Sequence, residues 1–216
     1  MNEHGSIMVS DFPLLSSAIL HEVKNHLAAL QLRLAARGDA SNEQALVANC
    51  AQRLTDLLLA QRVASGMLLA DVDAHSPADL LQDLATGYVE LFPALDIEVN
   101  LDQDPNTAFY DVFLLRMALG NALHNACHHA RKQVQLSVHS SNEGTVFQIT
   151  DDGPGFPSDF LAQGAAAPSN PGQTGTGLGL YLAGRIAALH RLGAHAGRVE
   201  LANAKAGGGI FRLIVP

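Results

Sequence analysis

The 216-residue sequence has no tryptophan, and aromatic residues make up only 5% of it, although 48% of its residues are hydrophobic. Any core must therefore be built mainly from Leu, Ala, Val and Ile side chains. Cysteine is also scarce: Cys50 and Cys127 lie in segments of helical pattern, without the short spacing of a metal-binding pair. This usage excludes a disulfide framework and favours a reducing, intracellular environment.

Clusters of basic residues are missing as well. The net charge is −8 with His neutral, which argues against binding to nucleic acid or to an anionic membrane surface. No run approaches the roughly 18 uncharged apolar residues of a membrane span, because Arg62 and Asp71 interrupt the most apolar stretch. The start, MNEHGSIMVS, lacks the basic and apolar regions of a signal peptide. We therefore expect a cytoplasmic protein without membrane insertion.

What the sequence does contain divides near residue 72. Residues 12–37 and 42–70 are rich in Leu and Ala at helical spacing, and RGDASNE separates them. The pattern predicts an antiparallel helical hairpin over residues 1–71. One apolar seam of the first helix recurs at steps of three and four, at Leu20, Val23, Leu27, Leu30 and Leu34. Two helices bury little surface, so we expect two chains to pair into a dimeric four-helix bundle. A hairpin packed on its own chain is the alternative.

Residues 72–216 show a different pattern, with helical and strand-like segments in turn. Helices are predicted at 77–91, about 110–130 and about 177–191, with a loop rich in Gly, Ala and Pro at 153–176. Strands are predicted at 96–101, 133–139, 145–150, 197–203 and 209–215. The chain is therefore expected to have an α+β fold, in which an α/β sandwich with a mixed or antiparallel sheet carries its helices on one face.

The segment HEVKNH, residues 21–26, resembles a zinc-binding helix, but its geometry excludes that. Two His on one helix share a metal when they are four residues apart, whereas His21 and His26 are five apart, about 140° around the helix. A role for His21 must therefore involve Glu22 and the residues that follow it.

The predicted helix at 110–130 carries an unusual polar face. Asn121, Asn125 and His128 follow one another at steps of four and three, which places them on one side, away from the core. A different face, suited to packing on the sheet, is formed by Val112, Leu115, Leu119, Ala122 and Ala126. The polar residues could be merely solvated, but Asn is unfavourable inside a helix. An amide oxygen is a suitable ligand for Mg²⁺.

Two glycine-containing segments follow. In DDGPGF, Asp151 ends a predicted strand and could accept a hydrogen bond from an exocyclic amine, while Gly153 and Gly155 would let a flat ring approach the backbone; an ordinary turn is the alternative. In GQTGTGLGLYLAGRIAALH, residues 172–190, glycines lead into a helix whose first N–H groups could bind phosphate. Neither the P-loop pattern nor the dinucleotide-fold pattern is present.

The order of these four motifs resembles the catalytic core of bacterial sensor histidine kinases. The motifs are HEVKN at 21, NALHNA at 121, DDGPG at 151 and GTGLGL at 175, and the ending GGGIFRLIVP is similar to the last strand of that family. The resemblance covers roughly residues 10–216. It implies a dimerisation and histidine-phosphotransfer hairpin, followed by an ATP-binding domain of the gyrase, Hsp90 and histidine kinase (GHKL) type that uses ATP and Mg²⁺.

The resemblance also implies roles for individual residues. His21 would accept the phosphoryl group, Glu22 would draw a proton from its imidazole, and Asn25 would orient water for dephosphorylation of the partner. Asn125 would bind Mg²⁺, helped by Asn121, and Asp151 would bind the adenine amine. The remaining nucleotide-binding positions would be His128, Gly153, Gly155, Gly175, Thr176, Gly177, Leu178 and Gly179. The implied partners are a second copy of the chain, a response regulator that receives the phosphoryl group on an Asp, and a separate sensor protein.

The sequence departs from the family pattern at three places. His26 stands where Pro is common, and His128 replaces a Lys, which would leave the phosphate contact weaker or dependent on pH. The lid, residues 156–174, is short, with only Phe156 and Phe160 as aromatic candidates. Two other functions stay open: a phosphotransferase or scaffold with a vestigial ATP-binding domain, and a serine kinase of the GHKL class that acts as an anti-sigma factor.

Overall fold

The structure is a computed structural model that describes residues 68–163 and 178–216, together with single positions of residues 1–67 (Val23, Leu27, Leu30, Val47, Cys50, Leu54, Thr55, Leu58 and Arg62). The chain divides into two compact units, Met1–Leu68 and Leu69–Pro216. The predicted positions His21, Glu22, Asn25, Gly175, Thr176 and Gly177 lie outside the described residues. Among the described residues, no helix has the length and hydropathy needed to cross a membrane.

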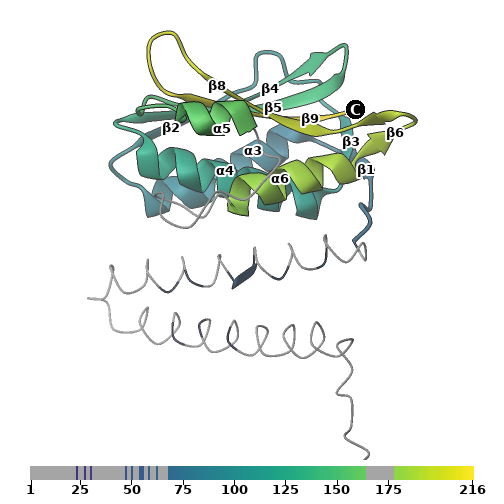
Figure 1. Cartoon of the computed structure of the whole chain (residues 1–216), viewed down its shortest axis with the longest axis horizontal. Coiled ribbons are helices and arrows are strands. Elements are labelled where there is room, and N and C mark those ends of the chain that lie inside the picture. Colours follow the sequence, from purple (N-terminus) through teal and green to yellow (C-terminus); the bar gives the residue numbers. More distant parts are fainter. Residues whose placement is uncertain are drawn as a thin grey trace, which may run out of the picture. The chain divides into compact units, whose positions relative to one another are not determined.

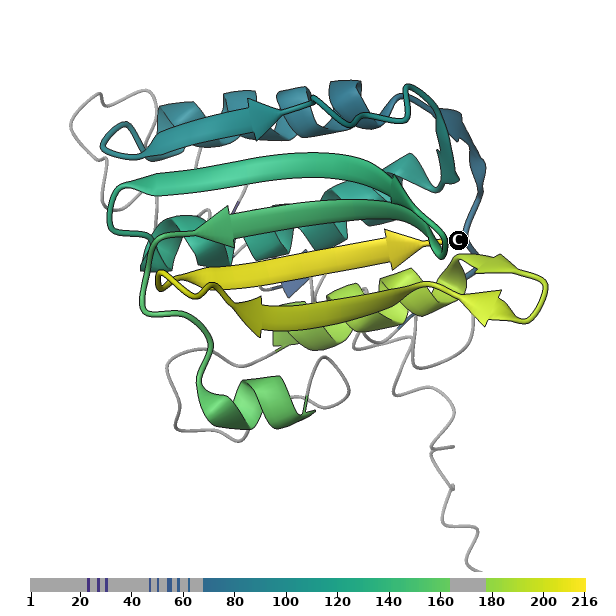
Figure 2. The same cartoon turned by 90° about the horizontal axis from the view of Figure 1, so that it is seen from above.

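The second unit is built on a five-stranded mixed sheet of order β2-β4-β5-β9-β8 (Figure 2). Strand β2 pairs with β4 in parallel, and the remaining neighbours are antiparallel. In the interior strand β4, buried side chains alternate with more accessible ones, as expected for a sheet covered on one face. The strands are β2 (Asp96–Asn100), β4 (Gln133–Ser141), β5 (Gly144–Asp151), β8 (Arg198–Asn203) and β9 (Gly209–Val215).

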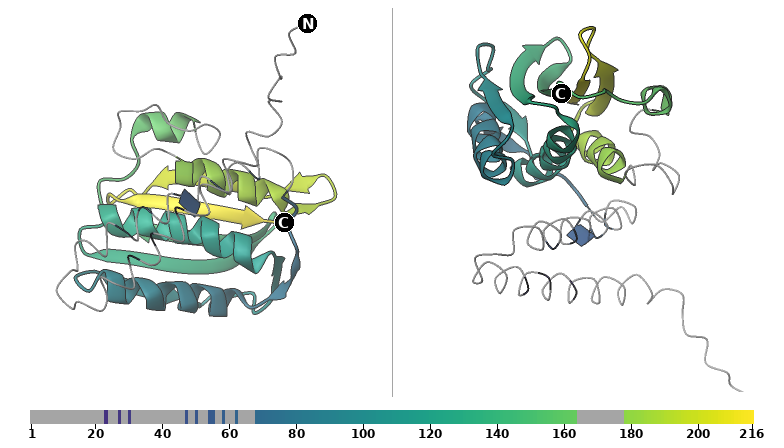
Figure 3. Two further views of the ribbon diagram at one scale, coloured as in Figure 1. Left: turned by 90° about the horizontal axis from the view of Figure 1, so that it is seen from below. Right: turned by 90° about the vertical axis from the view of Figure 1, so that its left-hand side faces the viewer.

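Three helices cover one face of this sheet, as predicted: α3 (Pro77–Leu91), α4 (Val112–His129) and α6 (Leu178–Leu189) (Figure 1). They lie side by side, with α4 between the other two (Figure 3). Local sequence explains where two of them begin. The Ser76 hydroxyl accepts a hydrogen bond from the Asp79 N–H at the start of α3, and Pro77 follows at the first helical position. Asp111 caps α4 in the same way.

The core fills the space between these helices and the sheet. Its fully buried side chains are almost all aliphatic, as the scarcity of aromatic residues requires; Tyr110 and Phe147 are the large exceptions. Their rings meet edge to face, with centroids 5.5 Å apart. Sheet residues of the core include Val134, Leu136, Ile149 and Leu213, and helix residues include Leu81, Leu115, Leu119, Leu182 and Ile186.

Several short elements were not predicted. Strands β1 (Asp73–His75) and β3 (Ala108–Tyr110) pair antiparallel, as do β6 (Arg191–Leu192) and β7 (His195–Ala196). The prediction of an unbroken loop over 153–176 is wrong in part, because α5 (Ser158–Gln163) forms within it and lies against β8 at the edge of the sheet (Figure 2). These elements have two to six residues, too few to show a hydrophobic period.

One buried polar group joins the ends of α4 and α6. The Nε2 atom of His190 accepts a hydrogen bond from the Asp111 N–H at 3.0 Å, and its Nδ1 atom lies 3.0 Å from the Ile186 carbonyl oxygen. Nδ1 must therefore carry the proton. Burial lowers the pKa of His190, which is only 2% exposed. The Asp111 carboxylate also accepts from the Asp71 N–H at 2.9 Å, so this network ties the beginning of the second unit to α4.

Candidate functional site

The two asparagines of α4 face the first turn of α6. A Cβ atom placed on Gly179 would lie 3.6 Å from Cβ of Asn121 and 3.8 Å from Nδ2 of Asn125. Gly179 therefore lies beside both amides, in the first turn of α6, which begins at Leu178. Asn125 is exposed, but the prediction that Asn121 lies away from the core is wrong: it is only 6% exposed. Asn121 is buried because it lies on the side of α4 that contacts α6.

Asp151, the last residue of β5, lies close to α4. Its Oδ1 atom accepts a hydrogen bond from the Gly153 N–H at 2.8 Å, and Oδ2 points toward Gly209, where an added Cβ would lie 2.7 Å away. Burial and the charge of Asp151 raise the pKa of Cys127 to about 12. This cysteine of α4 is therefore a protonated, apolar neighbour of the carboxylate, and no pattern in the sequence indicates that the two residues meet.

Close contacts at Gly153 and Gly155 leave no room for a side chain at either position. A Cβ on Gly153 would lie 2.3 Å from the carbonyl oxygen of His129, at the end of α4. Gly155 has a φ of +82°, and a Cβ there would lie 2.7 Å from Oδ1 of Asn203. The turn is thus held tightly between α4 and β8.

Asn203 is a residue of this site that the sequence analysis missed. Its side chain accepts a hydrogen bond from the Phe156 N–H at 2.7 Å and donates one to the Phe156 carbonyl at 2.9 Å. It pairs with the turn as a backbone strand would. The only signal in the sequence is an Asn at the end of a strand, before a glycine run, and that is too common to be specific.

Asp152 secures the turn from its other side. Its carboxylate accepts hydrogen bonds from the N–H groups of Arg131 and Lys132, at 2.7 Å and 3.0 Å for Oδ1. These hydrogen bonds lower the pKa of Asp152, and the bond from the Lys132 N–H has the largest effect. The segment that leaves α4 and the segment that leaves β5 are therefore fixed to each other.

His128 is exposed, and its ring packs on the α3 side of α4. Its Nε2 atom lies 3.1 Å from Nε2 of His124, and its ring meets Phe92 edge to face at 5.3 Å. The structure therefore brings Asn121, Asn125 and Gly179 together where α4 meets α6. Asp151 and Gly153 lie near the end of α4, and Gly155 lies beside Asn203 of β8. The His128 ring lies on the α3 side of α4, apart from the other predicted nucleotide-binding residues.

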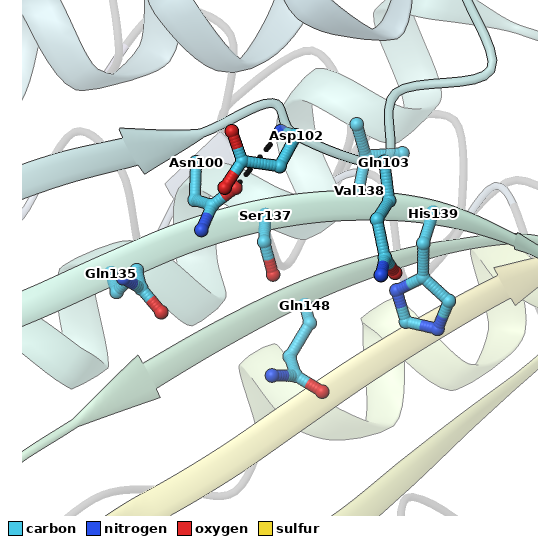
Figure 4. A pocket seen from close by; sticks show the side chains of 8 residues that line it. All are labelled: Asn100, Asp102, Gln103, Gln135, Ser137, Val138, His139 and Gln148. Atoms are coloured by element: carbon cyan, nitrogen blue, oxygen red, sulfur yellow. Dashed lines mark hydrogen bonds between the residues drawn. The ribbon is translucent and has the colours of Figure 1, made fainter.

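A separate hollow of about 290 Å³ lies among polar side chains of β2, β4 and β5 (Figure 4). The alternating strand positions of Gln135, Ser137 and Gln148 place these residues on the sheet face opposite the helices. The hollow is thus remote from the α4 residues described above. No group of three or more His, Cys, Asp or Glu that could hold a metal occurs in the described part of the chain.

Comparisons with known proteins agree with this arrangement. Residues 110–216 match the family model "Histidine kinase-, DNA gyrase B-, and HSP90-like ATPase". The chain is 31% identical over 182 residues to the signal transduction histidine-protein kinase AfsQ2 of Streptomyces coelicolor, an alignment that covers 79% of this chain and 32% of AfsQ2.

Two solved structures are also similar. The ATP binding domain of PrrB from Mycobacterium tuberculosis is 32% identical, with a TM-score of 0.53, and the match covers 68% of this chain and 97% of that domain. Full-length ShkA in complex with AMPPNP is 20% identical with a TM-score of 0.70, covering 94% of this chain and 46% of ShkA.

The matches differ in how much of each relative they cover. The chain spans about a third of the length of AfsQ2, so the activity and partners of the whole relative are not transferred with the fold. The PrrB domain, by contrast, is matched almost completely and at 32% identity. The chain therefore belongs to the sensor histidine kinases, and its residues 110–216 form a domain of the histidine kinase-, DNA gyrase B- and HSP90-like ATPases.

Proposed function

We propose that this chain binds ATP with Mg²⁺ around the C-terminal half of α4, phosphorylates its own His21, and passes the phosphoryl group to an Asp of a response regulator. The observation that carries the proposal is the placement of Asn121 and Asn125 beside Gly179, the last glycine of GTGLG, in the first turn of α6. An amide pair next to a glycine-rich helix N-terminus suits a triphosphate and its metal ion.

The adenine would bind at Asp151. Its Oδ1 atom is already bonded to the Gly153 N–H, which fixes the carboxylate, while Oδ2 accepts no hydrogen bond from the described residues and could take one from the exocyclic amine. Gly153 and Gly155 let the turn pack against His129 and Asn203, where a side chain would clash, and the turn thereby positions Asp151. Cys127, kept neutral by burial, supports the apolar side of such a pocket.

The metal requirement also fits the residues present. Asn125 is exposed and offers an amide oxygen, and Mg²⁺ is commonly held by one or two protein ligands together with substrate phosphates. Mg²⁺ would neutralise charge on the β- and γ-phosphates. Asn121 would orient Asn125 from the preceding turn, and Gly175, Thr176, Gly177 and Leu178 would bind phosphate through the backbone.

The nucleophile of the proposed reaction is the imidazole of His21. Its unprotonated nitrogen attacks the γ-phosphorus in line, the bond to the β-γ bridging oxygen breaks, and ADP leaves. Glu22 takes the proton that the imidazole loses, which keeps the ring nucleophilic before transfer. Asn25 would orient the water that later hydrolyses the phosphoaspartate of the regulator. Because ATP is the substrate, we place the reaction in the cytoplasm.

We further propose that residues 1–71 form the dimerisation and phosphotransfer hairpin and residues 72–216 the catalytic domain. Val23 and Leu30 are helical but 40% and 42% exposed in the single chain, whereas Val47 and Leu58 are buried. A second copy would cover the first pair, which supports a four-helix bundle.

Nucleotide binding tests the assignment of the pocket. Asp151→Asn places an amide opposite the adenine amine, and an unpaired polar group there costs about 1–3 kcal/mol, or roughly a tenfold or greater loss of affinity. Calorimetry with a non-hydrolysable ATP analogue and Mg²⁺ measures this loss, and Asp96→Asn, on the exposed edge strand, is the control. Unchanged affinity in Asp151→Asn would show that the pocket is wrongly assigned. No binding to the unaltered chain would favour the vestigial scaffold.

A further inference from the structure

Two imidazoles of α4 are arranged as a chelating pair. His124 and His128 are four residues apart on one helix, the spacing that His21 and His26 lack. Their Nε2 atoms lie 3.1 Å apart, and the ring planes meet at 76° with centroids 4.4 Å apart. At this centroid distance the two rings are inclined to each other and are not aligned end to end along the line through their Nε2 atoms.

The separation of the two nitrogens matches that of two ligands on one metal ion. For bonds of about 2.0–2.1 Å, two imidazole nitrogens lie about 2.9 Å apart at a right angle and about 3.3 Å apart at the tetrahedral angle. The observed 3.1 Å lies between these values. In the metal-free chain, one Nε2–H can donate to the other nitrogen; a metal ion would replace that proton.

The rings are held in this arrangement by aromatic side chains of α3 and the segment after it. Phe92 lies edge to face against both His124 and His128, with centroids 6.0 Å and 5.3 Å away. Tyr88 stacks beside Phe92 and is itself anchored, because its hydroxyl donates to the Gly120 carbonyl at 2.8 Å. Ligands whose orientation is fixed before binding lose less entropy when the ion arrives.

From this geometry we infer that His124 and His128 form a binding site for a divalent transition-metal ion that prefers imidazole, such as Zn²⁺, Ni²⁺ or Cu²⁺. The site is distinct in chemistry from the proposed Mg²⁺ site, because Mg²⁺ selects oxygen ligands and imidazole nitrogen selects the later transition metals. No group of three or more His, Cys, Asp or Glu that could hold a metal occurs among the described residues, so the inference names these two imidazoles as the protein ligands. The inference does not depend on nucleotide binding.

Calorimetry with Zn²⁺ alone, in a weakly coordinating buffer and without nucleotide, tests the site in the full chain. His124→Gln and His128→Gln should each lower the affinity of one Zn²⁺ site by about tenfold or more. His129→Gln is the matched control, since His129 is exposed and adjacent on the same helix, and it should leave that affinity unchanged. Equal Zn²⁺ affinity in all four proteins, or an equal loss in His129→Gln, would overturn the inference.

A second measurement uses the unaltered chain and therefore does not depend on whether a variant folds. In long-range ¹H–¹⁵N spectra of the imidazoles, Zn²⁺ should shift Nε2 of His124 and His128 together and leave both Nδ1 atoms protonated. Shifts at only one of the two rings, or none at either ring, would contradict the pair as the ligand set.

Discussion

Replacing His190 by Leu should destabilise the catalytic unit by breaking its buried hydrogen bonds. The substitution leaves the Asp111 N–H without its acceptor, 3.0 Å away in the native structure, and the Ile186 carbonyl without its donor. Each unpaired buried group costs about 1–3 kcal/mol, so the two together should cost about 2–6 kcal/mol. That is a large part of the roughly 5–15 kcal/mol that stabilises a domain.

The same residue should make stability depend on pH. Burial lowers the pKa of folded His190 below its ordinary value of 6.5. As the pH falls below 6.5, the unfolded chain binds a proton that the folded chain does not, so the free energy of unfolding decreases. The contribution is fully present above the unfolded pKa and falls by up to about 1.4 kcal/mol per pH unit below it. His190→Leu should lack this part of the pH dependence.

Urea unfolding followed by far-UV circular dichroism, at about pH 7.5 and about pH 6, measures both effects. The control is His195→Gln, because His195 is an exposed residue of the β6–β7 hairpin. The reasoning would be refuted if His190→Leu were as stable as the unaltered chain at the higher pH. It would equally fail if His190→Leu lost as much stability as the unaltered chain between the two pH values.

Two further predictions concern glycines and the dimer. Gly153→Ala should cost about 1–3 kcal/mol of stability and abolish nucleotide binding, because its Cβ would meet the His129 carbonyl at 2.3 Å. Gly179→Ala should stay folded, because its Cβ would make ordinary contacts of 3.6 Å or more. Thermal unfolding of both variants measures the difference in stability, and equal melting temperatures would contradict the prediction. Changing Leu27 and Leu30 to Lys should give monomers, because burying two charges costs several kcal/mol; light scattering at micromolar concentration measures this, and a monomeric unaltered chain would remove the basis for the bundle.

Most of the larger elements could be predicted because their local signals and their packing agree. The helix predicted at 77–91 begins and ends at those residues, since Ser76 and Pro77 give an unambiguous start. The strand predicted at 133–139 continues to Ser141, because its pairing with β5 extends to the hairpin turn. The family resemblance, carried by four motifs, is confirmed by the comparisons.

The parts that could not be predicted depend on contacts between distant segments. Asn121 looks like a surface residue in the helix pattern, but α6 packs against that side of α4, with Gly179 beside Asn121, and the side chain is buried. Asn203 contributes to the site through hydrogen bonds to Phe156, 47 residues away in sequence. Cys127 is linked to Asp151 only by the fold. Periodicity reports which face of an element is apolar, but not which element will cover it.

Phosphorylation of His21 is the most direct test of the proposed function. The full chain is incubated with γ-labelled ATP and Mg²⁺, and labelled peptides are mapped under alkaline conditions. We expect one acid-labile, base-stable label on His21 that is lost in His21→Gln and retained in His26→Gln, since His26 is followed by Leu27 and not by an acid. Label on His26, full labelling of His21→Gln, or an acid-stable label on Ser or Thr would contradict the account.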